Sequence, residues 1–417
     1  MSRIVTFRTG HTSAARALAA FVLLACSEQV DSPVSPPSDI AANFSPSTTP
    51  PATIGWHEQA RALVAANRFS TLSAERVYAV LSVAQYAAID KTDIHNRRDG
   101  TIPDHGFGPG GRARFELERG VVTGASWPVL SFFFPTAEPA LKELVRAEAT
   151  ARGWTHPHFL LGLAIGVAVA NKMIERTEND RFTVPFTGTI PVGPGFWIPN
   201  GPPVGATGAN VLPFLLTSAS QFRSPPPPAF QSPAFLTDLA EIKTLSDTRT
   251  AEQAAIARFW AFPAGTFTST GYWNQLAGNY VAQYRLNERA AAHVFALLHA
   301  AMFDANVVAC FDAKYTYWYI RPVQADPTIT LAIGMPNHPS YPSGHSCAAA
   351  AAANVLAHFF PDRAGDLQAQ VTEAGLSRMY GGLHYRFDIT AGQALGRAVA
   401  LNAINIDRRK GILSEIF

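Results

Sequence analysis

The chain has 417 residues, of which 47% are hydrophobic and 15% charged, so it is long enough for one large or two ordinary domains with a substantial core. Its formal charge of +2 and its lack of any Lys/Arg-rich run exclude the electrostatic footprint of a general nucleic-acid-binding protein, and we expect no nucleic-acid partner. Any site for an anion must therefore be local.

The N-terminal segment has the features of an export signal. Several arginines precede a short apolar stretch, ALAAFVLLA (17–25), which is too short to be a stable membrane anchor. With Cys26, the end of this stretch resembles a bacterial lipobox, in which the cysteine is lipidated and becomes the first mature residue. We therefore expect a lipoprotein signal peptide over 1–25 and an exported bacterial lipoprotein, anchored on the periplasmic or extracellular side of a membrane. An ordinary signal peptide with an incidental cysteine is the alternative.

The residues that follow, 26–55, are rich in Pro and Ser and cannot bury a core, which indicates a flexible tether. We expect no later apolar segment to reach the length of a transmembrane helix, so the lipid is the only predicted contact with a membrane. Besides Cys26 the chain has two cysteines, Cys310 and Cys347. They are too few for a disulfide framework and are predicted to be buried thiols, with a single bridge as the alternative.

Helical periodicity dominates from residue 56 onward, and alternating strand patterns are scarce. We predict an N-terminal helical bundle over 56–180, a Pro/Gly-rich wrapping loop over 181–230, and a C-terminal helical bundle over 231–417. The fold class is therefore all-α, with two packed helix bundles joined by a long Pro/Gly-rich connection.

Three fragments of the C-terminal bundle carry chemistry. In the first, KYTYWYIRP, Lys314 and Arg321 are seven residues apart, so on one helix they would lie nearly in line, about 10 Å apart. Two basic residues on a helix usually form a solvated face. Their neighbours here are mostly aromatic and apolar, and such a helix rarely carries unpaired charges.

The second fragment, PSGHS, precedes a run of six alanines that favours a helix. A helix start exposes unpaired N–H groups and the positive end of the helix dipole, so Ser343, Gly344 and His345 are suited to cradle an anion. A plain Ser/Gly helix cap with an incidental histidine is the alternative.

The third fragment runs from Ser377 to Asp388. The four-residue spacing of His384 and Asp388 lets the carboxylate accept a hydrogen bond from one ring nitrogen, which leaves the other nitrogen for a ligand or a nucleophilic role. A surface His/Asp pair on a helix would have the same spacing.

Taken together, these fragments read K-x6-RP, PSGH and SR-x5-H-x3-D. They resemble the three signature motifs of the type 2 phosphatidic-acid phosphatase and vanadium-dependent haloperoxidase superfamily, and every key residue is present between Lys314 and Asp388. The resemblance implies that the equatorial oxygens of phosphate or vanadate are bound by Lys314, Arg321, Ser343, Gly344 and Arg378.

The same resemblance assigns the remaining roles. It makes His384 the axial ligand of vanadium or the nucleophile towards phosphorus, with Asp388 orienting it and His345 as general acid/base at the opposite apex. Lys314 is also expected to take part in catalysis, by polarising the bound species. Three cations and fixed N–H donors suit an anion of two or three charges.

Within the superfamily, the length and double-bundle pattern of the chain resemble the soluble haloperoxidases more than the shorter acid phosphatases. The sequence therefore favours a haloperoxidase with vanadate as cofactor, and hydrogen peroxide and halide as substrates. His338 lies where bromide-using members carry a histidine and chloride-using members an aromatic residue, so bromide or iodide is expected; a simple loop histidine is the alternative.

Three other functions remain open from the sequence. An acid phosphatase would hydrolyse phosphate monoesters through a phosphohistidine, without a cofactor. A non-catalytic oxyanion-binding lipoprotein is disfavoured by the intact His345 and His384. A zinc site among the histidines is disfavoured by the surrounding cations. Nothing in the sequence specifies an oligomeric state.

The lipid anchor gives a first testable prediction. Replacing Cys26 by Ser removes the thiol that would be lipidated, so the Cys26→Ser protein should leave the membrane fraction or stall before processing. Fractionation of expressing cells measures this. Unchanged membrane association of the variant would contradict the anchor.

Overall fold

The structure is a computed structural model, and it describes residues 50–99, 109–151, 153 and 155–416. The predicted signal peptide, Cys26 and most of the tether lie outside these residues. The described part of the chain belongs to one compact unit. It is all-α, and within it the only β pairings are two isolated bridges.

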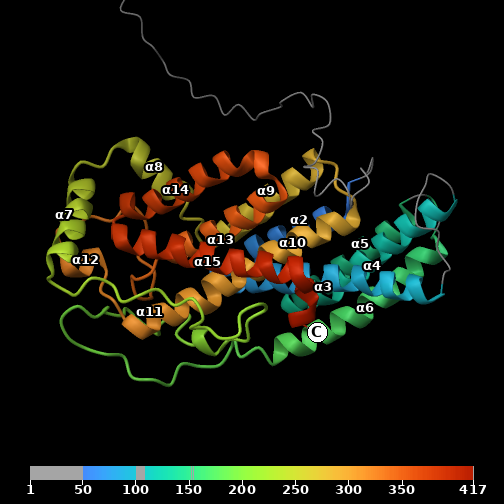
Figure 1. Cartoon of the computed structure of the whole chain (residues 1–417), viewed down its shortest axis with the longest axis horizontal. Coiled ribbons are helices and arrows are strands. Elements are labelled where there is room, and N and C mark those ends of the chain that lie inside the picture. The colour runs from blue at the N-terminus through green and yellow to red at the C-terminus, as the bar shows by residue number, and fades with distance from the viewer. Residues whose placement is uncertain (1–49, 100–108, 152, 154, 417) are drawn as a thin grey trace, which may run out of the picture. The chain divides into compact units, whose positions relative to one another are not determined.

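The N-terminal helices surround α3 (Thr71–Asp99), which packs against the next long helices and against the C-terminal half (Figure 1). They are α2 (Ala52–Ala66), α4 (Pro109–Phe133), α5 (Glu138–Thr150) and α6 (Pro157–Glu178). The C-terminal half contains α7 (Pro233–Asp247), α8 (Ala251–Phe259), α9 (Thr268–Gln283), α10 (Glu288–Phe303), α11 (Phe311–Tyr317), α12 (Pro322–Ala325), α13 (Gly344–Phe359), α14 (Ala364–Tyr380) and α15 (Arg386–Lys410). The remaining described elements are a π-helical segment between α10 and α11, η3 (Asp304–Cys310), and the short 3-10 turns η1 (Pro135–Ala137), η2 (Gly208–Asn210), η4 (Pro361–Arg363) and η5 (Ile412–Glu415).

One hydrophobic core runs through helices of both halves. The division of the chain into domains at residues 180 and 230 stays a prediction. The loop between α6 and α7 contacts the C-terminal half: Phe196 pairs with Tyr319, and the side chain of Tyr341 donates to the carbonyl of Pro225 over 2.7 Å.

The alanine run lies in α13, which packs between α10, α14 and α15 (Figure 1). All six side chains, Ala348 to Ala353, are at most 3% exposed. Small side chains let neighbouring backbones approach closely. At Gly396 of α15 a Cβ would lie 2.2 Å from the carbonyl oxygen of Cys347, so only glycine permits this crossing. Both Cys310 and Cys347 are buried and free, as predicted.

One helical expectation was wrong. The helix that carries Lys314 contains the π-helical η3 and ends at Tyr317, because Trp318 adopts a left-handed conformation with φ of 49°. Arg321 therefore does not lie on the helix of Lys314.

The expectation about later apolar segments was also wrong. Two helical stretches are long and apolar enough to cross a membrane by length and composition, Pro157–Glu178 and Glu288–Tyr317. The most apolar window of the second is completely buried within the protein, and that of the first is one-third buried. A helix that is apolar on all sides is typical of the core of a large helical protein.

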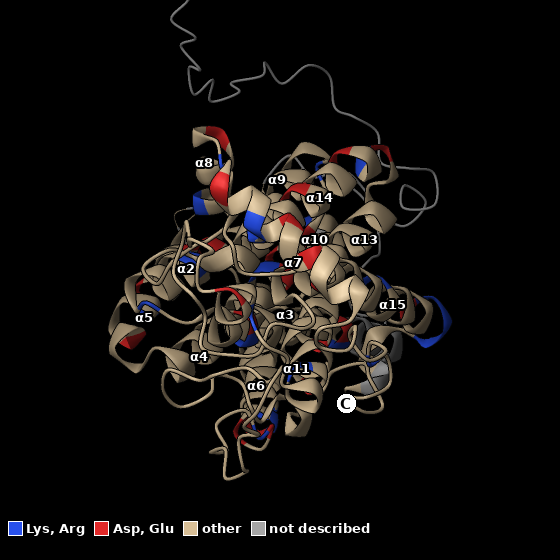
Figure 2. Ribbon diagram, turned by 90° about the vertical axis from the view of Figure 1, so that its left-hand side faces the viewer, with Lys and Arg blue, Asp and Glu red and all other residues tan. Residues whose placement is uncertain are grey.

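Charges are interspersed over the helices, and Figure 2 shows no helix composed mainly of one sign. The most basic helix end is the last turn of α15, with Arg408, Arg409 and Lys410. This distribution agrees with the small net charge and gives no extended basic surface among the described residues.

A buried polar cluster joins the two halves. The amide nitrogen of Asn274 donates to His57 Nδ1 and to His299 Nε2, each over 2.8 Å, while Arg61 donates to the amide oxygen over 2.5 Å. Because each ring accepts a hydrogen bond, both histidines are neutral. Burial lowers the pKa of both, and that of His299 falls to about 3.

This cluster predicts a pH dependence of stability. The unfolded chain binds a proton at position 299 below about pH 6.5, whereas the folded chain does so only near pH 3. The contribution of neutral His299 to the free energy of unfolding is therefore complete above the pKa of the unfolded chain. It falls by about 1.4 kcal/mol per pH unit as the pH drops from 6.5 towards 3. Urea unfolding at several pH values, compared with His299→Gln, isolates this slope from those of other groups. An identical slope in both proteins would contradict it.

Candidate active site

The three sequence fragments meet at one pocket. Lys314 comes from α11, Arg321 from the extended segment before α12, and Arg378 from the last turn of α14. The start of α13 brings Ser343, Gly344 and His345, and the loop before α15 brings His384. α13, α14 and α15 lie side by side, which explains why motifs far apart in sequence converge (Figure 1).

Ser343 caps α13. Its side chain accepts a hydrogen bond from the amide of Ser346 over 3.4 Å, and its own amide donates to the carbonyl of Asp388 over 3.0 Å. The cap ties the start of α13 to α15. The first helical amides, beginning at Gly344, have no acceptor within the helix and are suited to bind an anion.

The hydrogen bonds of His384 fix its tautomer. Its Nδ1 lies 2.8 Å from Asp388 Oδ2, and its Nε2 lies 3.1 Å from a guanidinium nitrogen of Arg321. Since a guanidinium can only donate, Nε2 carries the lone pair and Nδ1 carries the proton. Both an axial ligand and a nucleophile require this lone pair. Burial, followed by Arg321 and Lys314, lowers the pKa of His384 and keeps the ring neutral.

Asp388 is completely buried, and Oδ2 accepts from Ser340 Oγ over 2.5 Å and from the amide of Tyr385 over 3.2 Å in addition to His384. Burial raises the pKa of Asp388 to about 7. Ser340 thus holds Asp388 in place, and Asp388 in turn orients His384. Ser340 was not among the predicted site residues, although it lies between His338 and Ser343 in the sequence.

Arg321 spans the pocket wall. Its guanidinium donates to the carbonyls of His338 (2.9 Å) and Leu383 (3.0 Å) as well as to His384. Lys314 lies behind the wall, and its Nζ donates to the carbonyls of Pro339 (2.8 Å), Ser340 (2.9 Å) and Pro342 (2.5 Å). All three N–H groups of Lys314 are therefore used to hold the loop before α13.

The third cation, Arg378, donates to Ser377 Oγ over 2.9 Å and to the carbonyl of Ala257 over 3.1 Å. Lys314, Arg321 and Arg378 are at most 3% exposed, and no ion pair among the described residues includes any of them. Burial lowers their pKa values to about 8, 10 and 9, respectively. Three buried cations without a carboxylate partner create a strong local demand for an anion.

His345 and His338 are half-buried, and both line the pocket. His345 Nε2 donates to the carbonyl of Trp260 over 2.9 Å, so in the neutral ring the lone pair is on Nδ1. Burial and Arg378 lower its pKa. His338 Nδ1 lies 3.0 Å from a guanidinium nitrogen of Arg321 and 3.1 Å from the carbonyl oxygen of Pro339, and its ring packs against Phe311 with centroids 5.2 Å apart.

The pocket has a volume of about 390 Å³. Of the predicted site residues, it is lined by His338, Gly344, His345, Arg378 and His384. The others, Lys314, Arg321, Ser343 and Asp388, form the layer behind them. Asn306, from the π-helical η3, also lines the pocket and was missed, because its segment reads as part of an apolar helix.

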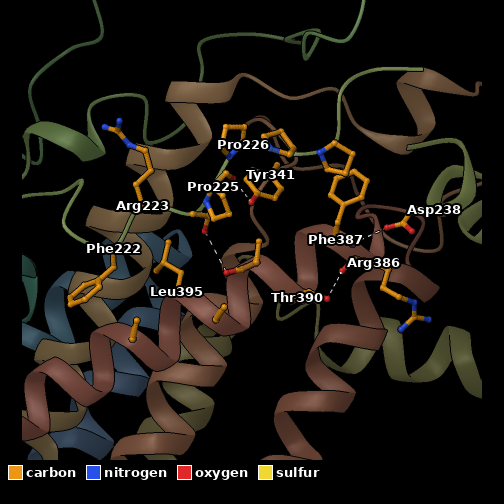
Figure 3. Close-up of a pocket in the computed structure, with 16 residues that line it drawn as sticks. Phe222, Arg223, Pro225, Pro226, Asp238, Tyr341, Arg386, Phe387, Thr390 and Leu395 are labelled. Atoms are coloured by element: carbon orange, nitrogen blue, oxygen red, sulfur yellow. Dashed lines mark hydrogen bonds between the residues drawn. The ribbon is translucent and has the colours of Figure 1, made fainter. Parts of the chain in front are cut away.

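A larger groove of about 740 Å³ contains none of the predicted site residues (Figure 3). It lies between the proline run 225–228 and the first turns of α15, with Tyr341, Phe387 and Leu395 in its wall. Its lining is mostly apolar. The charges that converge near His384 do not face it, so the smaller pocket is the candidate active site.

The donor set of the smaller pocket suits an oxyanion and not a cation. Among the described residues, no group of three or more His, Cys, Asp or Glu side chains is placed to hold a metal cation. By contrast, the pocket is lined by His384, Arg378 and the start of α13, and Lys314 and Arg321 lie behind this lining. This arrangement matches a tetrahedral oxyanion such as phosphate or vanadate.

Comparisons with known proteins agree with this geometry. Residues 289–412 match the model of the PAP2 superfamily. A non-specific acid phosphatase from Providencia stuartii is 29% identical over 187 residues, which are 43% of this chain and 70% of the relative.

Two solved structures share the fold. A bacterial vanadium-dependent iodoperoxidase has a TM-score of 0.72 and 23% identity, over 87% of this chain and 98% of that one. The holo form of a bacterial vanadium-dependent chloroperoxidase has a TM-score of 0.62 and 16% identity, over 80% and 91%. The two structures show a shared fold, and the family match places residues 289–412, which hold the motifs and the converging pocket, in the PAP2 superfamily.

Proposed function

We propose that the protein is a vanadate-dependent haloperoxidase that oxidises halide, preferably bromide or iodide, with hydrogen peroxide. The observation that carries the proposal is the placement of three buried, carboxylate-free cations around the lone pair of His384 Nε2. The fold likeness to two bacterial vanadium haloperoxidases over most of the chain supports the same branch of the superfamily.

Vanadate fits the residues that are present. His384 Nε2 would be its ligand, and its oxygens would be held by Arg321, Arg378, Lys314, the Ser343 side chain and the Gly344 amide. Lys314 and Arg321 would exchange hydrogen bonds to loop carbonyls for bonds to these oxygens. When bound, vanadate supplies the Lewis acidity that activates hydrogen peroxide towards halide.

The side chains of the protein would orient the ligand histidine, transfer a proton and stabilise the developing charge. Asp388 keeps the proton on His384 Nδ1 and so keeps the lone pair directed at the pocket. The lone pair on His345 Nδ1 can take a proton from hydrogen peroxide, because its Nε2–H is fixed by Trp260. The buried cations stabilise the negative charge that develops, without reorganising.

Halide choice is assigned to His338, which lines the pocket beside Phe311. Its ring is held by Arg321, and burial with the two neighbouring cations lowers its pKa, so it is a neutral polar group. A polar imidazole there suits the larger, more easily oxidised halides, which supports bromide or iodide over chloride.

A second candidate is an acid phosphatase, favoured by the 29% identity to the Providencia stuartii enzyme. In this reaction His384 Nε2 would attack phosphorus, and His345 would protonate the leaving alcohol. The lowered pKa of His345 opposes that second role, because a general acid must carry a proton before the bond breaks. Bound phosphate would oppose this lowering by its negative charge.

One prediction of this proposal concerns the affinity for the oxyanion. Replacing Lys314, Arg321 or Arg378 by Ala removes a charge-assisted interaction of about 1.5–3 kcal/mol, so affinity for vanadate or phosphate should fall roughly tenfold to a hundredfold. Calorimetric titration measures it. Arg386→Ala is a matched control, since Arg386 is a nearby arginine that pairs with Glu241 outside the pocket. Wild-type affinity in all three site variants would remove the basis of the proposal.

The second prediction concerns the reaction. The protein loaded with vanadate should halogenate a dye in the presence of hydrogen peroxide, faster with bromide or iodide than with chloride. His384→Ala should lose both turnover and the vanadium that co-elutes with the protein, while its circular dichroism stays helical. His358→Ala, which changes a histidine in the last turn of α13, should retain both.

The same preparations separate the two candidate reactions. Hydrolysis of a phosphate monoester by the vanadate-free protein, without any vanadate-dependent halide oxidation, would transfer the assignment to the phosphatase. Loss of activity in His384→Ala is expected in either case, so the substrate decides the outcome and not the variant.

A further inference from the structure

One polar side chain in the pocket belongs to none of the three motifs. Asn306 lies in the π-helical segment η3 between α10 and α11 and lines the pocket together with Gly344 and His345. π-Helical turns are rare and often occur at functional sites, because the wider turn redirects a side chain. Here the segment places a carboxamide in an otherwise apolar helical stretch.

The carboxamide nitrogen of Asn306 makes a hydrogen bond, whereas its oxygen makes none among the described residues. Asn306 is 3% exposed, and its Nδ2 donates to Glu75 Oε2 over 2.8 Å. Its Oδ1 is buried and has no hydrogen-bond partner among the described residues. A Cβ built on Gly344 would lie 3.0 Å from this oxygen, so Oδ1 is beside the helix start that is expected to cradle the anion.

Glu75 orients this carboxamide from α3. It is completely buried, and burial raises its pKa well above the usual range, which disfavours a negative charge beside the anion site. Its Oε2 engages Asn306 Nδ2 and thereby directs Oδ1 towards Gly344. A buried acceptor without a partner is costly, and a donor on a ligand would remove that cost.

We propose that Asn306 determines specificity in this pocket: its side-chain oxygen accepts a hydrogen bond from a protonated oxygen of the bound oxyanion. The inference rests on the proposed function, which supplies an oxyanion in the cradle. It goes further because this hydrogen bond would favour, among tetrahedral anions of equal charge, those that carry an O–H group.

Phosphate and sulfate are the probes that isolate this hydrogen bond. At mildly alkaline pH both are tetrahedral dianions of similar size, but HPO₄²⁻ carries one O–H group and SO₄²⁻ carries none. The buried cations attract both anions alike. Only phosphate can donate to Asn306 Oδ1, whereas sulfate would place a negative oxygen against the carbonyl oxygen.

The test is calorimetric titration of the full mature chain, free of vanadate, with phosphate and with sulfate. The wild-type protein should bind phosphate at least tenfold more tightly. Asn306→Leu, which is similar in volume, should lower the phosphate affinity roughly tenfold and change the sulfate affinity less than twofold. An equal loss for both anions, or no loss for phosphate, would overturn the inference.

Two substitutions at Glu75 provide a test that leaves Asn306 in place. Glu75→Gln keeps an acceptor for Asn306 Nδ2 without a charge and should preserve the preference for phosphate. Glu75→Leu removes the acceptor and should reduce that preference. If Asn306→Leu does not fold, this pair decides, and equal preferences in both Glu75 variants overturn the inference. Ser70→Ala, an exposed serine that lines the same pocket, is the control and should match the wild type.

Failure of the inference and failure of the proposed function give different results. If the wild-type protein binds neither phosphate nor sulfate, the oxyanion pocket itself is wrong and the inference falls with it. If it binds both anions but Asn306→Leu does not separate them, only the role of Asn306 is wrong. Neither result depends on which reaction the enzyme catalyses.

Discussion

The close approach of α15 to the start of α13 is the constraint on which the site depends. At Gly392 a Cβ would lie 2.6 Å from the carbonyl oxygen of Ser343, and at Gly396 it would meet the carbonyl of Cys347 at 2.2 Å. With glycine at both positions the helices touch along their backbones, and the amide of Ser343 reaches the carbonyl of Asp388. This contact sets the distance between the helix start and the His384–Asp388 pair. The buried alanines of α13 allow the other helices to close around it.

A second feature of the structure is the burial of titratable groups that lack a partner of opposite charge. Burial shifts the pKa values of several acids and histidines inside the protein towards their neutral forms, among them Glu75, His57 and His299, because desolvation disfavours their charged forms. The cations at the pocket are the exception, since arginine remains protonated even when burial lowers its pKa. The interior therefore concentrates positive charge at one place, although the chain as a whole is almost neutral.

The sequence predicted the helical class and the convergence of the motif residues, because apolar periodicity and motif spacing are local properties. It failed where tertiary packing overrides local preference. Trp318 turns into a left-handed conformation, so Arg321 reaches His384 from an extended segment and not from the helix of Lys314. Asn306 had no signal, because its role arises from a π-helical turn and from a partner 231 residues earlier in the chain.

The hydrogen bonds of Lys314 and Arg321 to the loop before α13 have a consequence for ligand selection. Both side chains already satisfy carbonyls of residues 338–342, so an incoming anion must compete with these carbonyls for the same N–H groups. The net gain on binding is then a difference between two sets of hydrogen bonds. A singly charged ion such as halide or acetate gains little from this exchange, whereas an anion with several charged oxygens gains at every donor. The loop carbonyls thus compete with the ligand for these N–H groups, so only an anion with several charged oxygens gains enough hydrogen bonds to occupy the cradle.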